Sequence, residues 1–486
     1  MIINCIREQV NLHAEKIAVQ TASATFTYKQ MIEEIDITAS RLYEKKPISN
    51  GTLAIYFPEN RVEFIIYFLA ASSIGWKTVP VDPKLPVEKV RKILQDSETD
   101  ILITDTYQQW WDGAMIFPDI DCSPTTLIKN NLPKATWESI FYLGYTSGTS
   151  GDPKGFVRTQ RSWTESFRNT GYEYNIQAGD QVIIPGSLVH SLFLYGTLHT
   201  LSTGATVELL GHFSADSLAR RVDRHKKTVL YVVPTMMETL LNQPYPQWED
   251  INLIISSGSK WNIDRRKRVE EMFTNAECIE FYGASELSFV SILHHRVAAE
   301  KMDSVGRPFS GVEVSIQDKH FQEVPCGEIG TLYVKSKMVF KEYHKLPQET
   351  ADVFRNGWVT AGDLARVDEE SFIYLVGRAN QMIISGGLNI YPDEVEQVFQ
   401  TVPEVEECAV MGMPDPYWGE KVVAFIKWRH GKEDIELLKR VCLDHLPKYK
   451  WPKEFITVDE FPRTVSQKIA RNELIQLFPE GFRNHE

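Results

Sequence analysis

The sequence predicts an α/β fold, with a large N-terminal domain of layered α/β subdomains and a β-rich subdomain, followed by a small α+β C-terminal domain. Three observations support this prediction. Before residue 311, short apolar runs typical of buried strands alternate with longer segments of helical periodicity. From about residue 311, short strands are separated by Gly and Pro turns, which indicates the β-rich subdomain. After Arg378, a last unit of about 100 residues has strands and helices of its own.

The elements expected in the alternating part are short and apolar. The strand-like runs are Thr52–Phe57, Ile101–Thr104, Ser139–Leu143, Gln181–Pro185, Val229–Val233, Leu253–Ser256 and Cys278–Phe281. Helical periodicity covers Val87–Gln95 and Ser214–His225. The longest apolar run, Phe64–Ala71, is far shorter than the roughly 20 residues needed to cross a bilayer. We therefore expect a buried helix there and no integral membrane association.

The remaining elements define the other two units. In the β-rich subdomain we expect strands at Val312–Ile316 and Gly330–Val334. In the last unit we expect strands at Ala409–Met411 and Val422–Ile426, and helices at Pro392–Gln400 and Asp434–His445. We accordingly place an N-terminal domain at residues 1–379, with its β-rich subdomain at about 311–379, and a C-terminal domain at 380–486.

Composition excludes several classes of protein. With 43% hydrophobic and 24% charged residues, the chain has the balance of an ordinary globular enzyme. A net charge of −13 disfavours binding to nucleic acid or to an anionic membrane, because phosphate surfaces would repel the chain as a whole. The six cysteines have no C-x-x-C spacing, so neither a zinc site nor a disulfide framework is indicated. The N-terminus lacks the pattern of a signal peptide, and we expect a cytoplasmic protein.

The segment Tyr145–Gly155 has the chemistry of a phosphate-binding loop. It follows a strand-like run and contains four hydroxyl residues, three glycines and Lys154. Glycines allow backbone N–H groups to face an anion, hydroxyls add donors, and the lysine adds a compact positive charge. The spacing is not that of Walker A, G-x-x-x-x-G-K-[ST]. The alternative is a flexible Ser/Gly linker.

Further motifs extend this pattern along the chain. They are Tyr282–Glu286, Thr360–Asp363, Gly377–Arg378, Ile384–Pro392 and Pro462–Lys468. Together with the loop, and in this order and spacing, they resemble the adenylate-forming superfamily of acyl-CoA synthetases, non-ribosomal peptide synthetase adenylation domains and firefly-type luciferases. The resemblance covers nearly the whole chain, with Ser150 and Ser285 at positions where Thr is commoner.

The resemblance implies a site for ATP and Mg²⁺. In the family, the aromatic ring at Tyr282 stacks on adenine, the hydroxyl at Ser285 touches the α-phosphate and Glu286 coordinates Mg²⁺, a hard cation that takes oxygen ligands; Thr146 is the second expected metal ligand. Asp363 would accept hydrogen bonds from the ribose hydroxyls and Arg378 would be a second ribose or phosphate contact. The expected residues for ATP, Mg²⁺ and coenzyme A are Thr146, Ser147, Gly148, Thr149, Ser150, Gly151, Lys154, Ser257, Gly258, Ser259, Tyr282, Gly283, Ala284, Ser285, Glu286, Asp363, Arg378, Gly386 and Gly387.

For several of these residues a structural role is the alternative to a role in binding. Backbone at Ser257–Ser259 would line the adenine, although a turn that caps a helix explains the segment nearly as well. His190 matches the family position that abuts the acyl group, and a structural histidine is the alternative. The pair His294–His295 has no partner ligand at metal spacing, and we expect it to be solvated.

The C-terminal domain carries the remaining expected residues. In the family, the lysine at Lys468 bridges the substrate carboxylate and the α-phosphate, and the glycines at Gly386 and Gly387 let the pantetheine arm of coenzyme A pass. Gln467 stands where the family has Gly, and Gln381 where its hinge residue is often Asp or Lys. The resemblance implies that this domain is mobile and rotates about a hinge near 380–382 between two half-reactions.

The implied activity is AMP-forming acid–thiol ligation. A carboxylic acid, expected to be a fatty or other apolar acid, becomes acyl-AMP with release of pyrophosphate, and the coenzyme A thiol then displaces AMP. Alternatives are transfer to a carrier-protein thiol, an aryl-CoA ligase, a luciferase-like oxygenase, and a non-catalytic nucleotide-binding protein.

Overall fold

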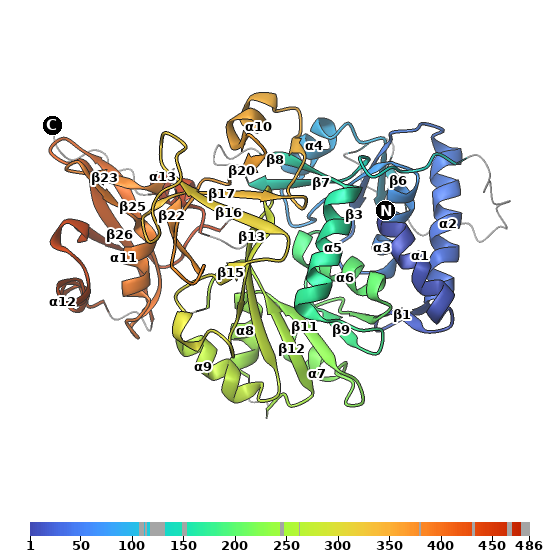
Figure 1. The fold of residues 1–486 in the computed structure, drawn as a ribbon, viewed down its shortest axis with the longest axis horizontal. Helices are drawn as coiled ribbons and strands as arrows, with labels where there is room; N and C mark the ends of the chain where they lie inside the picture. Colours follow the sequence, from blue (N-terminus) through green and yellow to red (C-terminus); the bar gives the residue numbers. More distant parts are fainter. Residues whose placement is uncertain are drawn as a thin grey trace. The chain divides into compact units, whose positions relative to one another are not determined.

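The computed structural model describes residues 1–105, 111, 114–116, 132–147, 153–243, 247–261, 263–378, 381–429, 433–463 and 469–477. The described residues form two compact units. Figure 1 shows their helices and strands, coloured along the sequence. The first comprises those up to Val314 together with Val334–Val359, and the second comprises Ser315–Tyr333 and those from Thr360 onward.

A nine-stranded sheet in the first unit has the order β15-β14-β13-β12-β11-β9-β10-β1-β2. Its strands are β1 (Ile17–Gln20), β2 (Thr25–Thr27), β9 (Gln181–Ile184), β10 (Thr206–Leu209), β11 (Thr228–Val232), β12 (Ile251–Ser256), β13 (Glu277–Ala284), β14 (Ser288–His294) and β15 (Arg307–Pro308). The six neighbouring strands β13, β12, β11, β9, β10 and β1 are parallel to one another. At the two edges of the sheet, β2, β14 and β15 pair antiparallel. Apolar side chains of β11 and β12 pack on the helices α7 (Ala215–Ala219), α8 (Pro234–Leu241) and α9 (Ile263–Met272).

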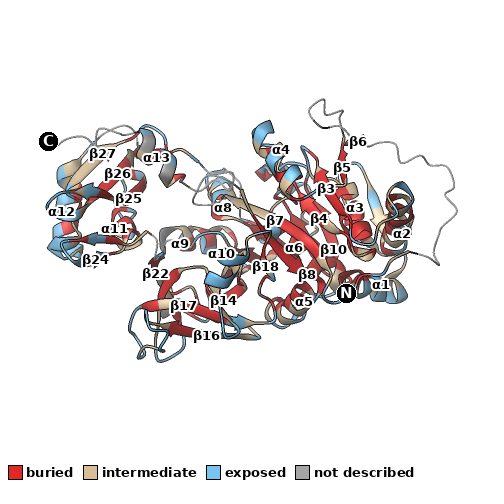
Figure 2. Ribbon diagram, turned by 90° about the horizontal axis from the view of Figure 1, so that it is seen from above, coloured by how far each residue is buried: buried red, intermediate tan, exposed pale blue. Residues whose placement is uncertain are grey.

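A seven-stranded sheet in the same unit has the order β18-β8-β7-β4-β3-β5-β6. Its strands are β3 (Thr52–Tyr56), β4 (Lys77–Pro80), β5 (Ile101–Thr104), β6 (Ala114–Ile116), β7 (Ile140–Ser147), β8 (Pro153–Thr159) and β18 (Glu342–Tyr343). The helices of this part of the chain are α1 (Ile2–His13), α2 (Tyr28–Lys45), α3 (Val62–Ser73), α4 (Val87–Asp96), α5 (Gln160–Tyr174) and α6 (Ser191–Thr203). The sheet strands are largely buried, while several helices, such as α2 and α4, present exposed outer faces (Figure 2).

Short antiparallel strands follow in the chain from residue 312. They are β16 (Val312–Gln317), β17 (Gly330–Ser336), β19 (Phe354–Arg355), β20 (Trp358–Val359), β21 (Asp363–Val367) and β22 (Ile373–Arg378), and α10 (Pro347–Val353) interrupts them. In the first unit, β19 and the end of β17 pair with β20. In the second unit, β22 and the start of β17 pair with β21.

The second unit also contains a five-stranded sheet of order β24-β23-β26-β25, with β27 paired to β26. Its strands are β23 (Ile383–Ser385), β24 (Leu388–Ile390), β25 (Val405–Asp415), β26 (Gly419–Trp428) and β27 (Glu454–Thr457), and its helices are α11 (Pro392–Phe399), α12 (Ile435–His445) and α13 (Arg471–Leu477). Successive residues of β25 enter different cores: Cys408 and Val410 pack with α11 and α12, and Ala409 and Met411 with α13. This alternation is the two-residue period of a strand buried on both faces.

The α/β fold class is confirmed, and most expected elements are present within a few residues of their predicted bounds. Phe64–Ala71 lies in α3 and is buried throughout. The bounds of four elements need correction. The helix expected over Ser214–His225 ends at Ala219. The strands expected to end at Leu143 and Phe281 continue to Ser147 and Ala284, and the strand expected at Ala409–Met411 spans Val405–Asp415. These strands are longer because their added residues pair with β8, β14 and β26, contacts that the local sequence does not indicate. Among the described residues, no helix is long and apolar enough to span a bilayer.

Candidate functional site

The hairpin of β13 and β14 presents the Tyr282–Glu286 motif. Tyr282 pairs with Ser291 and Gly283 with Phe289. A Cβ atom at Gly283 would lie 2.1 Å from the Ser288 carbonyl oxygen, so only glycine fits here. All five motif residues are partly exposed, whereas the adjoining Leu287 and Phe289 are buried. The hairpin therefore holds the motif at the surface over an apolar base.

Glu286 is linked to the β7–β8 hairpin through Tyr343. The Tyr343 hydroxyl donates a hydrogen bond of 2.6 Å to Glu286 Oε1, and Lys154 Nζ lies 3.3 Å from the centre of the Tyr343 ring. Thr146 pairs with Lys154 across the hairpin and donates its hydroxyl to the Lys154 carbonyl oxygen at 3.4 Å. Tyr343 reaches this place because β18 pairs with β8, Tyr343 opposite Phe156. Glu286 and Lys154 thus both contact Tyr343, and Thr146 lies beside Lys154 on the neighbouring strand.

Arg158 lies buried beneath this group with 4% of its surface exposed. Its guanidinium donates to the Ser162 hydroxyl at 3.2 Å, to the Ser285 carbonyl oxygen at 3.4 Å and to the Met338 carbonyl oxygen. Burial lowers the pKa of Arg158 to about 10, against the opposing influence of nearby tyrosines and Glu286, so the side chain stays charged at neutral pH. The sequence motifs do not include Arg158, although an arginine that directly follows the apolar pair Phe156–Val157 in a strand is the signal that marks it.

The turn Ser257–Lys260 follows β12 and lies beside β13, since Ser256 pairs with Glu280. The Ser257 hydroxyl donates to the Phe281 carbonyl oxygen at 2.9 Å, and Gly258 has a φ of +109°. Because β12 and β13 are parallel, the turn and the β13 end that carries Tyr282 lie at the same edge of the sheet.

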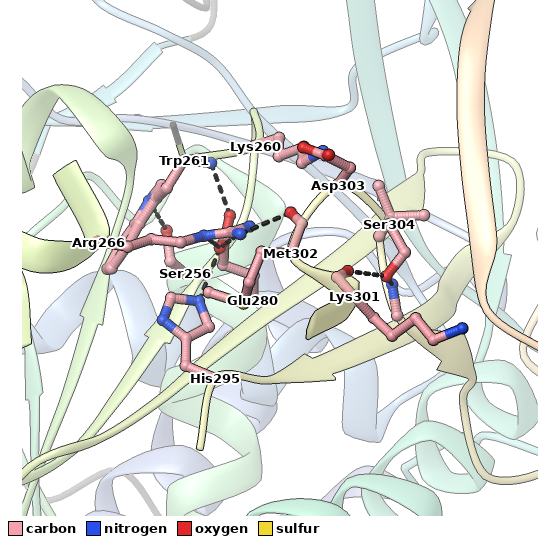
Figure 3. Close-up of polar contacts among 12 residues, drawn as sticks. Ser256, Lys260, Trp261, Arg266, Glu280, His295, Lys301, Met302, Asp303 and Ser304 are labelled. Atoms are coloured by element: carbon pink, nitrogen blue, oxygen red, sulfur yellow. Dashed lines mark hydrogen bonds and ion pairs between the residues drawn. The ribbon is translucent and has the colours of Figure 1, made fainter. Parts of the chain in front are cut away.

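His295 contradicts the expectation of a solvated histidine pair. It is 3% exposed, and its Nε2 lies 2.7 Å from Glu280 Oε1 (Figure 3). His294 is partly buried and pairs with Glu277 at 2.7 Å. His294 ends β14 and His295 follows it, and their pairing with the β13 carboxylates of Glu277 and Glu280 buries His295 and partly buries His294.

His190 occupies the N-cap of α6 without a side-chain capping bond and is partly buried. Burial lowers the pKa of His190, while Asp82 and Lys84 act in opposite directions, so the neutral imidazole is favoured at neutral pH.

In the second unit, Asp363 and Arg378 form an ion pair across β21 and β22. Arg378 Nε donates to Asp363 Oδ1 at 3.1 Å, and Asp363 is 7% exposed. Nearby, burial raises the pKa of Asp393 to about 6, with a further contribution from Glu396. The buried carboxyl group of Asp393 therefore lies close enough to the ion pair to interact with it electrostatically.

The raised pKa of Asp393 has a consequence for stability. Its folded value of about 6 exceeds its ordinary value of 3.8, so the unfolded chain ionises first and stability falls as pH rises through this window. We expect Asp393→Asn to lack that loss and to gain on the order of 2 kcal/mol relative to the parent between pH 4 and pH 7. Thermal unfolding of both proteins across this range measures the difference, and a difference independent of pH would contradict the assignment.

Gly386 and Gly387 form the turn between β23 and β24, with φ of +58° and +80°. The Gly386 N–H donates to the Trp418 carbonyl oxygen at 2.8 Å, and a Cβ at Gly386 would lie 3.0 Å from the Trp418 ring. The turn therefore requires glycine at both positions for its backbone and, at Gly386, for space.

Some predicted residues lie outside the described part of the chain. These are Gly148, Thr149, Ser150, Gly151 and Lys468, and residue 380 of the expected hinge; for Ser147 only the backbone, at the end of β7, is described.

Comparison with known proteins identifies the family. The family of AMP-binding enzymes matches residues 6–344, and the C-terminal domain of AMP-binding enzymes matches residues 394–468. The chain is 36% identical to an uncharacterized acyl-CoA ligase, YhfT, of Bacillus subtilis, over 94% of each chain. It is 29% identical to a 2-succinylbenzoate–CoA ligase of Bacillus pumilus, over 97% of each. The structure resembles that of O-succinylbenzoate coenzyme A synthetase from Bacillus subtilis in complex with ATP and magnesium, with a TM-score of 0.89, 28% identity, and coverage of 97% of this chain and 99% of that one. The chain therefore belongs to the AMP-binding enzyme family, and its predicted resemblance to adenylate-forming acyl-CoA synthetases is confirmed.

Proposed function

We propose that this protein is an AMP-forming acyl-CoA ligase. A carboxylic acid attacks the α-phosphorus of ATP, pyrophosphate leaves, and the coenzyme A thiol then attacks the acyl carbon of acyl-AMP and displaces AMP. The observation that carries the proposal is that Glu286 and Lys154 both contact Tyr343, and that Thr146 is bonded to the backbone of Lys154 on the adjoining strand. A carboxylate, a cation and a hydroxyl held by these neighbouring strands are the groups that a metal–triphosphate requires.

The chemistry of these groups fits Mg²⁺. Glu286 and Thr146 offer hard oxygen ligands, and both side chains are partly exposed. Mg²⁺ commonly takes only one or two protein ligands and completes its shell with phosphate oxygens and water. When bound, the ion neutralises charge on the phosphates. Among the described residues, no cluster of three or more His, Cys, Asp or Glu side chains could hold a metal ion. They support a site in which protein side chains and the phosphates of ATP both supply ligands to the ion.

The proposed nucleotide contacts rest on the resemblance of the motifs to those of the family. Tyr282 and the backbone of Ser257–Ser259 would hold adenine, Ser285 the α-phosphate, and Asp363 with Arg378 the ribose. The loop residues Ser147, Gly148, Thr149, Ser150 and Gly151 would surround the phosphates. Their donors position the reacting groups and stabilise the developing charge, and no covalent bond to the enzyme is needed.

The proposed roles of the C-terminal residues divide between the two half-reactions. Lys468 stabilises charge between the carboxylate and the α-phosphate while acyl-AMP forms. The turn at Gly386 and Gly387 admits the pantetheine arm of coenzyme A while the thioester forms. A domain of residues 380–486 that rotates about 380–382 would present them in succession.

The acid is proposed to be apolar. The segments that would line its site, Leu188–Gly196, Val232–Thr235 and Leu287–Ile292, contain no acidic side chain to pair with an amino group. His190 would abut the acyl group. An aryl acid is the second candidate, since the Tyr195 and Phe289 rings in these segments lie 4.9 Å apart in an edge-to-face arrangement, to which another ring could add. Similarity to a 2-succinylbenzoate–CoA ligase supports the same candidate.

ATP–pyrophosphate exchange with a panel of acids tests the proposal. Straight-chain fatty acids, aryl acids and amino acids are compared, each with and without coenzyme A. We expect exchange with a fatty or aryl acid and a thioester only with coenzyme A. Exchange with amino acids alone, or no thioester with free coenzyme A, would contradict the proposal.

Glu286→Gln is expected to raise the Mg²⁺ concentration for half-maximal exchange by about 10-fold, because it removes the charge of a metal ligand but preserves the shape of the side chain. Titration of Mg²⁺ at saturating ATP and acid measures this change. Glu342→Gln, next to Tyr343 on β18, is the control and should leave the titration unchanged. Equal titrations for all three proteins would show that Glu286 is not the ligand.

A further inference from the structure

We propose that Glu280, Arg266 and His295 form a buried positioning network that holds the turn Ser257–Lys260 in place and thereby sets the affinity for ATP. This inference rests on the proposed function, because adenine is assigned to that turn there. The network includes no residue that would touch the nucleotide. It acts through the backbone of the turn.

Glu280 is the centre of the network (Figure 3). Its Oε1 accepts from Arg266 Nε at 3.0 Å, from Arg266 Nη2 at 2.8 Å and from His295 Nε2 at 2.7 Å, and its Oε2 accepts from the Trp261 backbone N–H at 2.8 Å. The exposed fractions of Glu280, Arg266 and His295 are 7%, 3% and 3%. Four hydrogen bonds thus converge on one carboxylate that has little access to water.

The network reaches the turn at its end, and β13 holds it at its start. Trp261 is 1% exposed, and its indole N–H donates to the Ser256 hydroxyl at 3.1 Å. With the bond from Glu280 to its backbone, this fixes the residue that closes the turn. At the start, the Ser257 hydroxyl binds the Phe281 carbonyl oxygen at 2.9 Å. Between these anchors lie Gly258 and Ser259, which are exposed.

The position of Glu280 in β13 relates the turn to Tyr282. Side chains two apart in a strand share a face of the sheet, so Glu280 and Tyr282 lie on the same face. A carboxylate that fixes the turn from this strand therefore also fixes the distance between the two elements that would enclose adenine. Hydrogen bonds and ring stacking both depend on this distance, so a displaced turn would bind adenine less tightly.

The segment 301–304 braces the network from its other side. Arg266 Nη1 donates to the Met302 carbonyl oxygen, and Lys260 at the end of the turn lies 3.6 Å from Asp303. The Ser304 hydroxyl closes this segment by donating to the Lys301 carbonyl oxygen at 2.7 Å. The turn is consequently tied to two separate parts of the chain.

The charge state agrees with this role. Burial opposes ionisation of Glu280, but the hydrogen bond from His295 and the charge of Arg266 outweigh it and hold the pKa of Glu280 below its ordinary value. The ionised carboxylate accepts all four bonds. A neutral amide at this position would present an N–H₂ group to one set of donors and lose part of the network.

The same two strands provide a matched control. Glu277 and His294 also form a 2.7 Å carboxylate–imidazole pair between β13 and β14. Their side chains are 42% and 27% exposed, and no contact joins Glu277 to the turn in the described structure. Glu277→Gln therefore changes the same chemistry three residues away without touching the turn.

The experiment compares ATP–pyrophosphate exchange in Glu280→Gln and Glu277→Gln proteins. We expect Glu280→Gln to raise KM for ATP by about 10-fold, with kcat within about 3-fold and KM for the acid unchanged. Glu277→Gln should leave all three constants within about 2-fold. His295→Gln, which retains the Arg266–Glu280 pair, should shift KM for ATP in the same direction by a smaller factor, and it serves as the test if Glu280→Gln does not fold.

Two other outcomes separate this inference from the proposed function. A Glu280→Gln or His295→Gln protein that melts earlier but retains the parent KM for ATP would overturn the positioning role and leave a purely structural one. Tyr282→Ala tests the adenine site itself. If Tyr282→Ala also left KM for ATP unchanged, the nucleotide assignment would be wrong, and this inference would be overturned with it.

Discussion

Replacement of Lys468 with alanine is expected to slow acyl-adenylate formation by about 100-fold or more and to spare transfer from preformed acyl-AMP to coenzyme A. The reason is electrostatic. When the carboxylate attacks the α-phosphorus, negative charge develops between the two anionic groups. A single positive group placed there lowers the activation free energy by several kcal/mol. Thioester formation does not need this positive charge. In the proposed scheme of two domain orientations, Lys468 is also absent from the site during that step.

The two half-reactions can be measured separately. ATP–pyrophosphate exchange reports the first, and single-turnover thioester formation from synthetic acyl-AMP reports the second. Lys439→Ala, which removes an exposed lysine of α12 paired only with Glu436 in the described structure, is the control and should affect neither. If Lys468→Ala slowed both half-reactions equally, Lys468 would not have the assigned role.

Arg158→Met is expected to cause the largest loss of stability, on the order of 3 kcal/mol or more. It removes the guanidinium that donates to the buried Met338 carbonyl oxygen and to the partly exposed Ser285 carbonyl oxygen. Arg158→Lys should recover only part of the loss, since an ammonium group cannot reproduce the fork of a guanidinium.

Arg161→Met provides the comparison for Arg158. Arg161 lies three residues further on and pairs with Glu138 at 2.6 Å, but both side chains are more than half exposed. We expect it to change stability by less than about 1 kcal/mol. Denaturant unfolding of the three variants measures these effects, and equal losses for Arg158→Met and Arg161→Met would refute the buried role.

The sequence predicted the sheets well because buried parallel strands are short apolar runs that differ visibly from their surroundings. Ile101–Thr104 is an example, matching β5 residue for residue. It predicted the ends of elements less well where long-range pairing decides them. β13 continues to Ala284 because β14 folds back onto it, and the helix that begins at Ala215 stops early although its periodicity continues.

In the site too, residues in local motifs could be predicted, whereas residues brought in by long-range pairing could not. Glu286, Lys154 and Asp363 stand out because each lies in a compact motif with a recognisable chemistry. Tyr343 does not, because it reaches Glu286 only through the pairing of β18 with β8. His295 was expected in water for a similar reason: Glu280 and Arg266, which surround it, come from β13 and α9.

Transfer of oxygen from the acid to AMP tests the central claim most directly. The acid is labelled with ¹⁸O in its carboxylate, and the reaction with ATP, Mg²⁺ and coenzyme A is analysed by mass spectrometry. If the carboxylate attacks the α-phosphorus, the oxygen that bridges acyl group and phosphate stays with AMP when the thiol attacks the acyl carbon. We expect one ¹⁸O in each AMP formed and none in pyrophosphate. Unlabelled AMP, or ADP as the product, would contradict adenylate formation by this protein.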